Sequence, residues 1–153
     1  LALLADAGDI GPLQSVLESV PNLVSDISGN PGMLLEPGAS VTFTITSKDR
    51  FRRFSMAAML IPTNDTFVAV NSVHLPSRSR TVDALAYDAG SEPNDELCAN
   101  IPGPPCMGAG PSEEAGGEGF VHIANGIHGV GDLEPAVYDW RSPVARVRIR
   151  RVH

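Results

Sequence analysis

Acidic side chains crowd into nine consecutive positions of the chain. They are Asp88, Glu92, Asp95 and Glu96, and no Lys or Arg lies among them. A further acid, Asp65, lies in a short turn signal upstream. If the two loops share one end of the fold, Asp65, Asp88 and Glu92 converge, and three close carboxylates repel one another unless a cation or a proton neutralises them. These three residues are therefore candidate metal ligands.

Calcium is the cation that suits such residues best. It accepts about six to eight oxygen ligands in flexible geometry, and irregular loops supply them readily. Magnesium requires a stricter octahedron, and zinc prefers His or Cys. The spacing does not match the D-x-D-x-D-G loop of EF-hands, and acidic loops are often simply solvated. The residue types alone therefore leave both a calcium site and a solvated loop open.

Two cysteines, Cys98 and Cys106, are the only ones in the chain. They lie eight residues apart in a Pro-rich stretch, with no second pair and no neighbouring His, which is poor for zinc and favours a disulfide. A disulfide implies an oxidising compartment, so we expect a secreted protein found extracellularly or at the cell surface. No run of 18 apolar residues is present, so membrane insertion is not expected, and the chain reads as a mature product without its signal peptide.

The elements that would position these acids are mostly strands. Val41, Phe43 and Ile45 alternate with threonines, which is the period of a half-buried strand. Gly and Pro punctuate such segments at the spacing of sandwich strands. Strands are predicted at 39–47, 54–62, 66–75, 80–88 and 144–152, and a further strand with an Asn125-Gly126 turn is predicted within 119–129.

One short amphipathic helix is predicted near the N-terminus, because Leu13, Val16, Leu17 and Val20 share a face and Pro12 suits the first helical position. The acidic loop from about 88 to 117 is too long and too rich in Gly and Pro for a simple connector. The fold class expected is all-β, with one N-terminal helix and a long acidic loop.

The charge distribution bears on partners. The formal net charge is −7, and residues 81 to 140 contain acids but no Lys or Arg. Basic residues instead gather at the C-terminus, as Arg141, Arg146, Arg148, Arg150 and Arg151. An acidic field of this size repels phosphate, so nucleic acid is not expected as a partner.

The sequence favours a protein that is not an enzyme. It contains neither a G-x-S-x-G elbow nor an H-E-x-x-H motif. His122 and His128 are the best candidates for chemistry, but a two-residue turn at Asn125-Gly126 would place their imidazoles on opposite faces of a hairpin. We expect structural or surface histidines, and Trp140 in the core or a lid. An accessory or hydrolytic domain acting on extracellular protein or carbohydrate is the alternative.

A resemblance to a known family rests on the stretches "MLIPTNDTFVAVN", "YDAGSEPNDELC", "IPGPPC", "GEGFVHIANGIHG" and "DWRSPVARVRI". Together they resemble bacterial members of the spondin-domain family, related to the N-terminal spondin domain of F-spondin, over about residues 1–149. The resemblance implies a secreted, C2-like antiparallel β-sandwich with calcium held by loop acids at one end. By motif, the ligands would be Asp65, Asp88 and Glu92, with Asn64 and Asp95 supporting them. Relatives often have Asp where this chain has Glu92.

The resemblance also bears on assembly. Family members usually begin with a further strand upstream of the segment that resembles "LALLADAGD", so we expect residues 1–153 to form a single spondin-like domain lacking that first strand. Such an open sheet position needs a cover, and the acidic middle and Arg-rich end of the chain are complementary. We therefore expect a calcium-stabilised, non-enzymatic structural or adhesion module that assembles into a filament or surface layer, or binds an extracellular protein.

Overall fold

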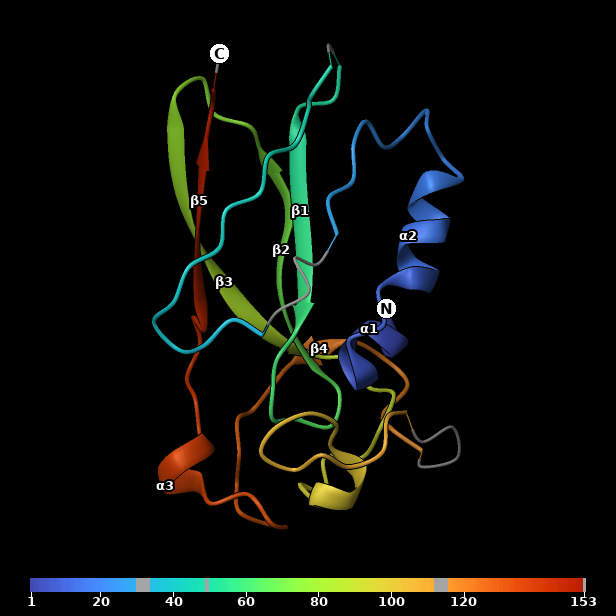
Figure 1. Ribbon diagram of the computed structural model, residues 1–153, viewed down its shortest axis with the longest axis vertical. Helices are drawn as coiled ribbons and strands as arrows, with labels where there is room; N and C mark the ends of the chain where they lie inside the picture. Colours follow the sequence, from blue (N-terminus) through green and yellow to red (C-terminus); the bar gives the residue numbers. More distant parts are fainter. Residues whose placement is uncertain (30–33, 49, 112–115, 153) are drawn as a thin grey trace. The chain divides into compact units, whose positions relative to one another are not determined.

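The computed structural model describes residues 1–29, 34–48, 50–111 and 116–152 (Figure 1). The chain divides into two compact units. Leu1–Asp9 and Arg53–His153 form the larger unit, and Ile10–Arg52 form the smaller. The three candidate ligands all belong to the larger unit.

A curled antiparallel sheet forms the frame of the larger unit. Strands β1, β2, β3 and β4 follow one another in that order, and β5 also pairs with β3. β1 and β2 run side by side through the middle of Figure 1, and β3 diverges from them to lie beside β5. The strands are β1 Arg53–Met59, β2 Thr66–His74, β3 Ser79–Asp88, β4 His122–Ile123 and β5 Ala145–Arg150. The prediction of a β-rich antiparallel fold is therefore confirmed.

The register of these strands brings chemically important residues together. Thr66 at the start of β2 pairs with Asp88 at the end of β3. On its other side, Asp88 pairs with His122 of β4. Asp65, which precedes β2, and His122 thus lie at the same end of the sheet as Asp88.

Alternating apolar side chains form the core on the sheet. Val68, Val70 and Ala84 are buried, and half-buried Met56 and Val147 pack against them. On β5, half-buried Val147 and Ile149 alternate with exposed arginines. This packing fixes which face of β2 and β3 points inward, because a slip by one residue would expose every apolar side chain.

Helix is somewhat more frequent than the sequence indicated. The predicted amphipathic helix is confirmed as α2 (Gly11–Glu18), which has Pro12 in its first turn. The expectation of a single helix was wrong, since α1 (Ala2–Ala7) and α3 (Pro135–Tyr138) are also present. Both are too short to produce a periodic pattern that stands out from the background.

The strand predicted at 39–47 is not formed, which corrects the sequence interpretation. Val41, Phe43 and Ile45 are 42%, 48% and 37% exposed, so the apolar face of the pattern is not buried. The Thr46 N–H donates to Asp26 Oδ2 at 2.5 Å, and Ser25 Oγ donates to the Thr46 carbonyl at 3.2 Å. Side chains therefore satisfy this backbone in place of a strand ladder.

The hairpin predicted around Asn125-Gly126 is also absent. β4 pairs with the end of β3. After Gly126 the backbone bonds to a side chain in place of a strand, because Ile127 N donates to Asp139 Oδ1 at 3.2 Å. Gly126 does have a positive φ of 92°, and an added Cβ would lie 2.5 Å from Asp139 Oδ1. The turn signal was thus real, but it does not join two strands.

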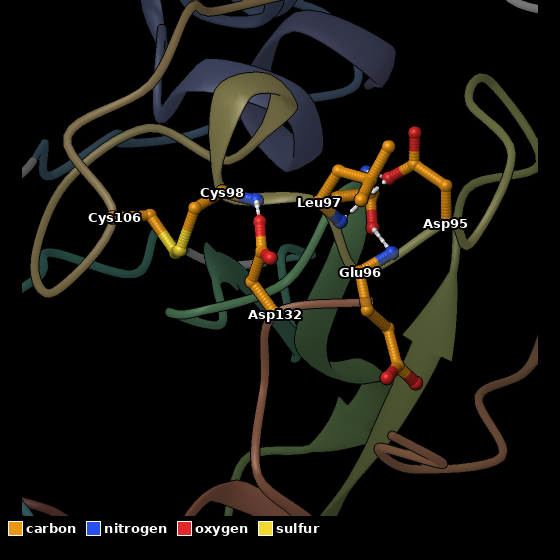
Figure 2. The surroundings of a disulfide bond; sticks show 7 residues. Asp95, Glu96, Leu97, Cys98, Cys106 and Asp132 are labelled. Atoms are coloured by element: carbon orange, nitrogen blue, oxygen red, sulfur yellow. Dashed lines mark hydrogen bonds between the residues drawn. A yellow bond between two sulfur atoms is a disulfide. The ribbon is translucent and has the colours of Figure 1, made fainter. Parts of the chain in front are cut away.

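The long acidic loop and the segment after β4 share a small core. Ile101, Ile127 and Leu133 are buried, and Cys98 and Cys106 pack against them. The predicted disulfide between the two cysteines is confirmed, with Cα atoms 4.6 Å apart. Figure 2 shows Asp132 beside this bond, where its Oδ2 accepts the Cys98 N–H at 2.9 Å. One 3-10 turn, η1 (Cys98–Asn100), lies between the two cysteines.

Membrane insertion was not expected, and within the described part of the chain no helix has the length and apolar character that a membrane span requires.

Candidate metal centre

Asp65 joins the start of β2 to the loop that follows β3. Its Oδ2 accepts the Ser91 N–H at 2.8 Å and the Glu92 N–H at 3.1 Å. Its carbonyl accepts the Ala89 N–H at 3.1 Å. The loop after Asp88 therefore wraps around Asp65. All three candidate ligands are buried, with exposed fractions of 0% for Asp65, 2% for Asp88 and 1% for Glu92.

The other carboxylate oxygen of Asp65 lacks a hydrogen-bond partner among the described residues. Oδ1 is buried, and no described residue makes a hydrogen bond to it. Burial raises the pKa of Asp65, and the charge of Asp88 adds to the rise even though the Glu92 and Ser91 donors oppose it. No Lys or Arg among the described residues pairs with Asp65 or Asp88. A cation or a proton is needed to compensate this buried oxygen.

Asp88 is held in one orientation by its own loop. Its Oδ1 accepts the Gly90 N–H at 2.8 Å, and its Oδ2 accepts Asn94 Nδ2 at 2.6 Å. Each carboxylate oxygen has two lone pairs, so both keep capacity for a metal ion. Asp88, Asn94, Thr66 and His128 also line a small cavity of about 100 Å³, which has room for water beside the carboxylate.

Asp6 is a further buried acid beside these ligands, and the sequence interpretation missed it. It lies on α1, is 4% exposed, and its Oδ1 accepts the Ser91 hydroxyl at 2.6 Å. Burial raises the pKa of Asp6 to about 6, and the charges of Glu92 and Asp65 contribute to the rise. Asp6 was detectable only as a lone acid among the apolar residues of "LALLADA".

A second group of ligand atoms adjoins Asp88. Asp88, Glu118 and His122 could hold a metal ion, since one ligand atom from each lies within 4.8 Å of the others. His122 Nε2 is 3.7 Å from Asp88 Oδ1 and 3.8 Å from Glu118 Oε2. The pKa of His122 is raised, first by the hydrogen bond to the Ile123 carbonyl and then by the charges of Asp88, Glu118 and Asp65. The sequence favoured a structural or surface role for His122 over a histidine metal site, and these neighbours make the metal site the one to test.

Glycines make this approach of Glu118 possible. The Gly119 N–H donates to the Gly90 carbonyl at 2.8 Å. A Cβ on Gly90 would lie 2.4 Å from the Phe120 carbonyl oxygen, and a Cβ on Gly117 would lie 2.4 Å from the Gly90 carbonyl oxygen. Only glycine fits at both positions, because any side chain would separate the two backbones.

Asn64 and Asp95 hold the loops in place. Asn64 Nδ2 donates to Asp95 Oδ1 at 2.9 Å, and Asn64 Oδ1 accepts the Glu96 N–H at 3.2 Å. Burial acts to raise the pKa of Asp95, but hydrogen bonds from Leu97 N, Asn64 and Asn100 outweigh it and lower the pKa. Their polar atoms are thus engaged in contacts between loops.

Comparison with known proteins adds no relative: no protein-family model, curated protein or solved structure matches the chain. The resemblance to the spondin-domain family stays a prediction.

Proposed function

We propose that the chain is a secreted, calcium-stabilised, non-enzymatic structural or adhesion module with the C2-like sandwich architecture of the spondin-domain family. The observation that carries the proposal is the buried Asp65 Oδ1, which has no hydrogen-bond partner among the described residues. A buried carboxylate oxygen is costly unless a hydrogen bond or a cation compensates it. A cation beside Asp65 and Asp88 removes that cost.

Calcium is the ion that these surroundings favour. Asp65, Asp88 and Glu92 offer hard oxygen ligands at a strand end and in the loops beside it, and the cavity beside Asp88 can supply water ligands. The ligands come from the start of β2, the end of β3 and the loop beyond it. An ion there would tie these segments together, which is the role of a stabilising metal.

The chemistry of the surrounding loop supports a structural role. Asp95 and Glu96 accept backbone and side-chain donors, so these acids brace the loop. The Cys98–Cys106 disulfide is compatible with an extracellular location, because such bonds persist in oxidising compartments.

Calcium is expected to raise the melting temperature of the purified protein. At a concentration about 100 times the dissociation constant, an ion that binds only the folded state adds about 2.7 kcal/mol. Asp65→Asn should remove most of this gain, measured as the difference between melting in calcium and in chelator. This difference is the right quantity because removing a buried charge also changes the stability of the metal-free protein.

Asp83→Asn is the matched control. Asp83 lies on the exposed part of β3, where its Oδ1 accepts Arg146 Nε at 3.2 Å. The same chemical change there should leave the calcium gain intact. Identical melting curves for the wild type in calcium and in chelator would exclude the calcium site.

A second copy of the chain is the partner we favour for such a module. On β5, Arg148 and Arg150 lie opposite Thr81 and Ser79 of β3, and no described acid pairs with either arginine. This exposed basic stripe can meet the acidic surface of another copy, in a head-to-tail contact that forms rings or filaments.

Self-assembly of this kind should weaken as salt screens the charges. Light scattering and electron microscopy at low salt should show assemblies that shorten at high salt. The double variant Arg148→Gln and Arg150→Gln should remain monomeric at both salt concentrations. A wild type that is monomeric at high protein concentration in every buffer would contradict this assembly.

A further inference from the structure

We infer that Asp88, Glu118 and His122 form a second metal position, selective for a borderline transition ion of the zinc type, beside the proposed calcium position and sharing Asp88 with it. The position goes beyond the proposed function, because its two distinguishing ligands, Glu118 and His122, take no part in the calcium site.

The state of the His122 imidazole is the first argument. His122 Nδ1 lies 3.1 Å from the Ile123 carbonyl oxygen. A carbonyl can only accept, so Nδ1 carries a proton, and in the neutral imidazole Nε2 keeps its lone pair. In metal sites the non-ligating ring nitrogen commonly makes such a hydrogen bond, which fixes the ring and makes the other nitrogen a better ligand. His122 is therefore arranged as an Nε2 ligand.

The atoms that Nε2 faces are the second argument. They are Asp88 Oδ1 at 3.7 Å and Glu118 Oε2 at 3.8 Å. Two carboxylate oxygens and a lone pair repel one another unless a proton or a cation lies between them. Tetrahedral zinc, with bonds of about 2.0–2.1 Å, needs ligand atoms about 3.3 Å apart, so small side-chain movements complete the geometry.

Burial and access fit a metal position as well. Asp88 is 3% exposed at its side chain, while His122 and Glu118 are 27% and 40% exposed. The buried acid forms the base, and the two partly exposed ligands leave a path by which an ion can enter. Phe120 contacts the imidazole edge-to-face, with ring centroids 5.5 Å apart, and limits its rotation.

The fully buried Asp65 Oδ1, assigned above to the calcium position, indicates that this end of the sheet requires positive charge, since no described residue bonds to it. The charge of Asp65 acts on His122, and the charge of Asp88 acts on Asp65. Calcium alone does not account for His122, because calcium takes oxygen ligands while imidazole suits zinc and its neighbours in the transition series.

The test is a zinc chloride titration of the full chain by calorimetry, in chelator-treated protein with calcium both absent and saturating. One zinc per chain should bind the wild type. His122→Ala should weaken the binding more than about tenfold, and Glu118→Gln about tenfold, since even partners of ligands contribute that much. The melting temperature in chelator checks that each variant is folded, and a retained calcium gain shows that the calcium position survives.

His74→Ala is the matched control. His74 is an exposed histidine at the far end of β2, opposite Arg53 of β1, and its loss should leave the zinc affinity unchanged. Nitrogen-15 NMR of the histidines should show Nε2 of His122 as the ligand and Nδ1 still protonated. Equal zinc affinity in the wild type and His122→Ala, or an equal loss in His74→Ala, would overturn the inference.

Discussion

Glu96→Ala is expected to destabilise the protein by about 3–5 kcal/mol, the largest effect of any single substitution considered. Glu96 is 3% exposed, and its carboxylate accepts three consecutive backbone donors: His128 N at 2.6 Å, Gly129 N at 2.7 Å and Val130 N at 2.9 Å. Removing the carboxylate leaves these three N–H groups without an acceptor, and a buried donor without a partner costs about 1–3 kcal/mol.

The backbone of Glu96 is engaged too, so the residue links three segments. Its N–H donates to Asn64 Oδ1 at 3.2 Å, and its carbonyl accepts the Asp132 N–H at 2.8 Å. These backbone bonds survive the substitution, which means that the measured loss reports the carboxylate alone.

Urea unfolding measures the effect. Glu36→Ala is the control, because Glu36 is exposed and a surface substitution of this kind changes stability by less than about 0.5 kcal/mol. Glu96→Gln should fall between the two, since an amide oxygen keeps some of the acceptor capacity while its NH₂ group faces a backbone donor. A loss below about 1 kcal/mol for Glu96→Ala would show that water replaces the carboxylate.

The contrast between the strands and the acidic loop shows what a single sequence can predict. Strands β1, β2, β3 and β5 were predicted to within a few residues, because alternation and the flanking Gly and Pro are local signals. The segment 39–47 has the same alternation and forms no strand. Periodicity reports a potential apolar face, but it does not report whether a partner strand is available.

The composition of the site depends on distant contacts that no local pattern reveals. The antiparallel order predicts that the start of β2 and the end of β3 share one end, and Thr66 indeed pairs with Asp88. Asp6 reaches Ser91 across 85 positions, and Glu96 reaches His128 across 32. Such contacts require the packing of α1 and of the loop, so Asp6 and the role of Glu96 emerged only from the structure.

Asp6→Asn is expected to abolish a pH dependence of the metal-free protein. The pKa of Asp6 rises from 3.8 to about 6 in the folded state, so folding favours its protonated form. The resulting stability is present below pH 3.8 and is lost as the pH rises through about 6. Each pKa unit corresponds to 1.36 kcal/mol, which makes the loss about 3 kcal/mol at most.

The substitution is close to isosteric. The asparagine oxygen can accept the Ser91 hydroxyl as Asp6 Oδ1 does at 2.6 Å, so the variant loses the charge and keeps the hydrogen bond. In chelator, Asp6→Asn and the wild type should therefore have similar stability near pH 4, and the variant should be more stable by up to about 3 kcal/mol near pH 7.5. Chemical unfolding at a series of pH values measures this divergence.

Calcium should narrow the stability difference between the two proteins at pH 7.5. The Asp6 charge acts on Asp65 and Glu92, so it repels them in the metal-free state and attracts a cation bound between them. Asp6→Asn should consequently reduce the calcium-dependent gain in stability, while Asp83→Asn, on the exposed part of β3, should change neither the pH profile nor the gain. If the stability difference between Asp6→Asn and the wild type were the same at pH 4 and pH 7.5 in chelator, the Asp6 carboxylate would not carry the buried charge assigned to it.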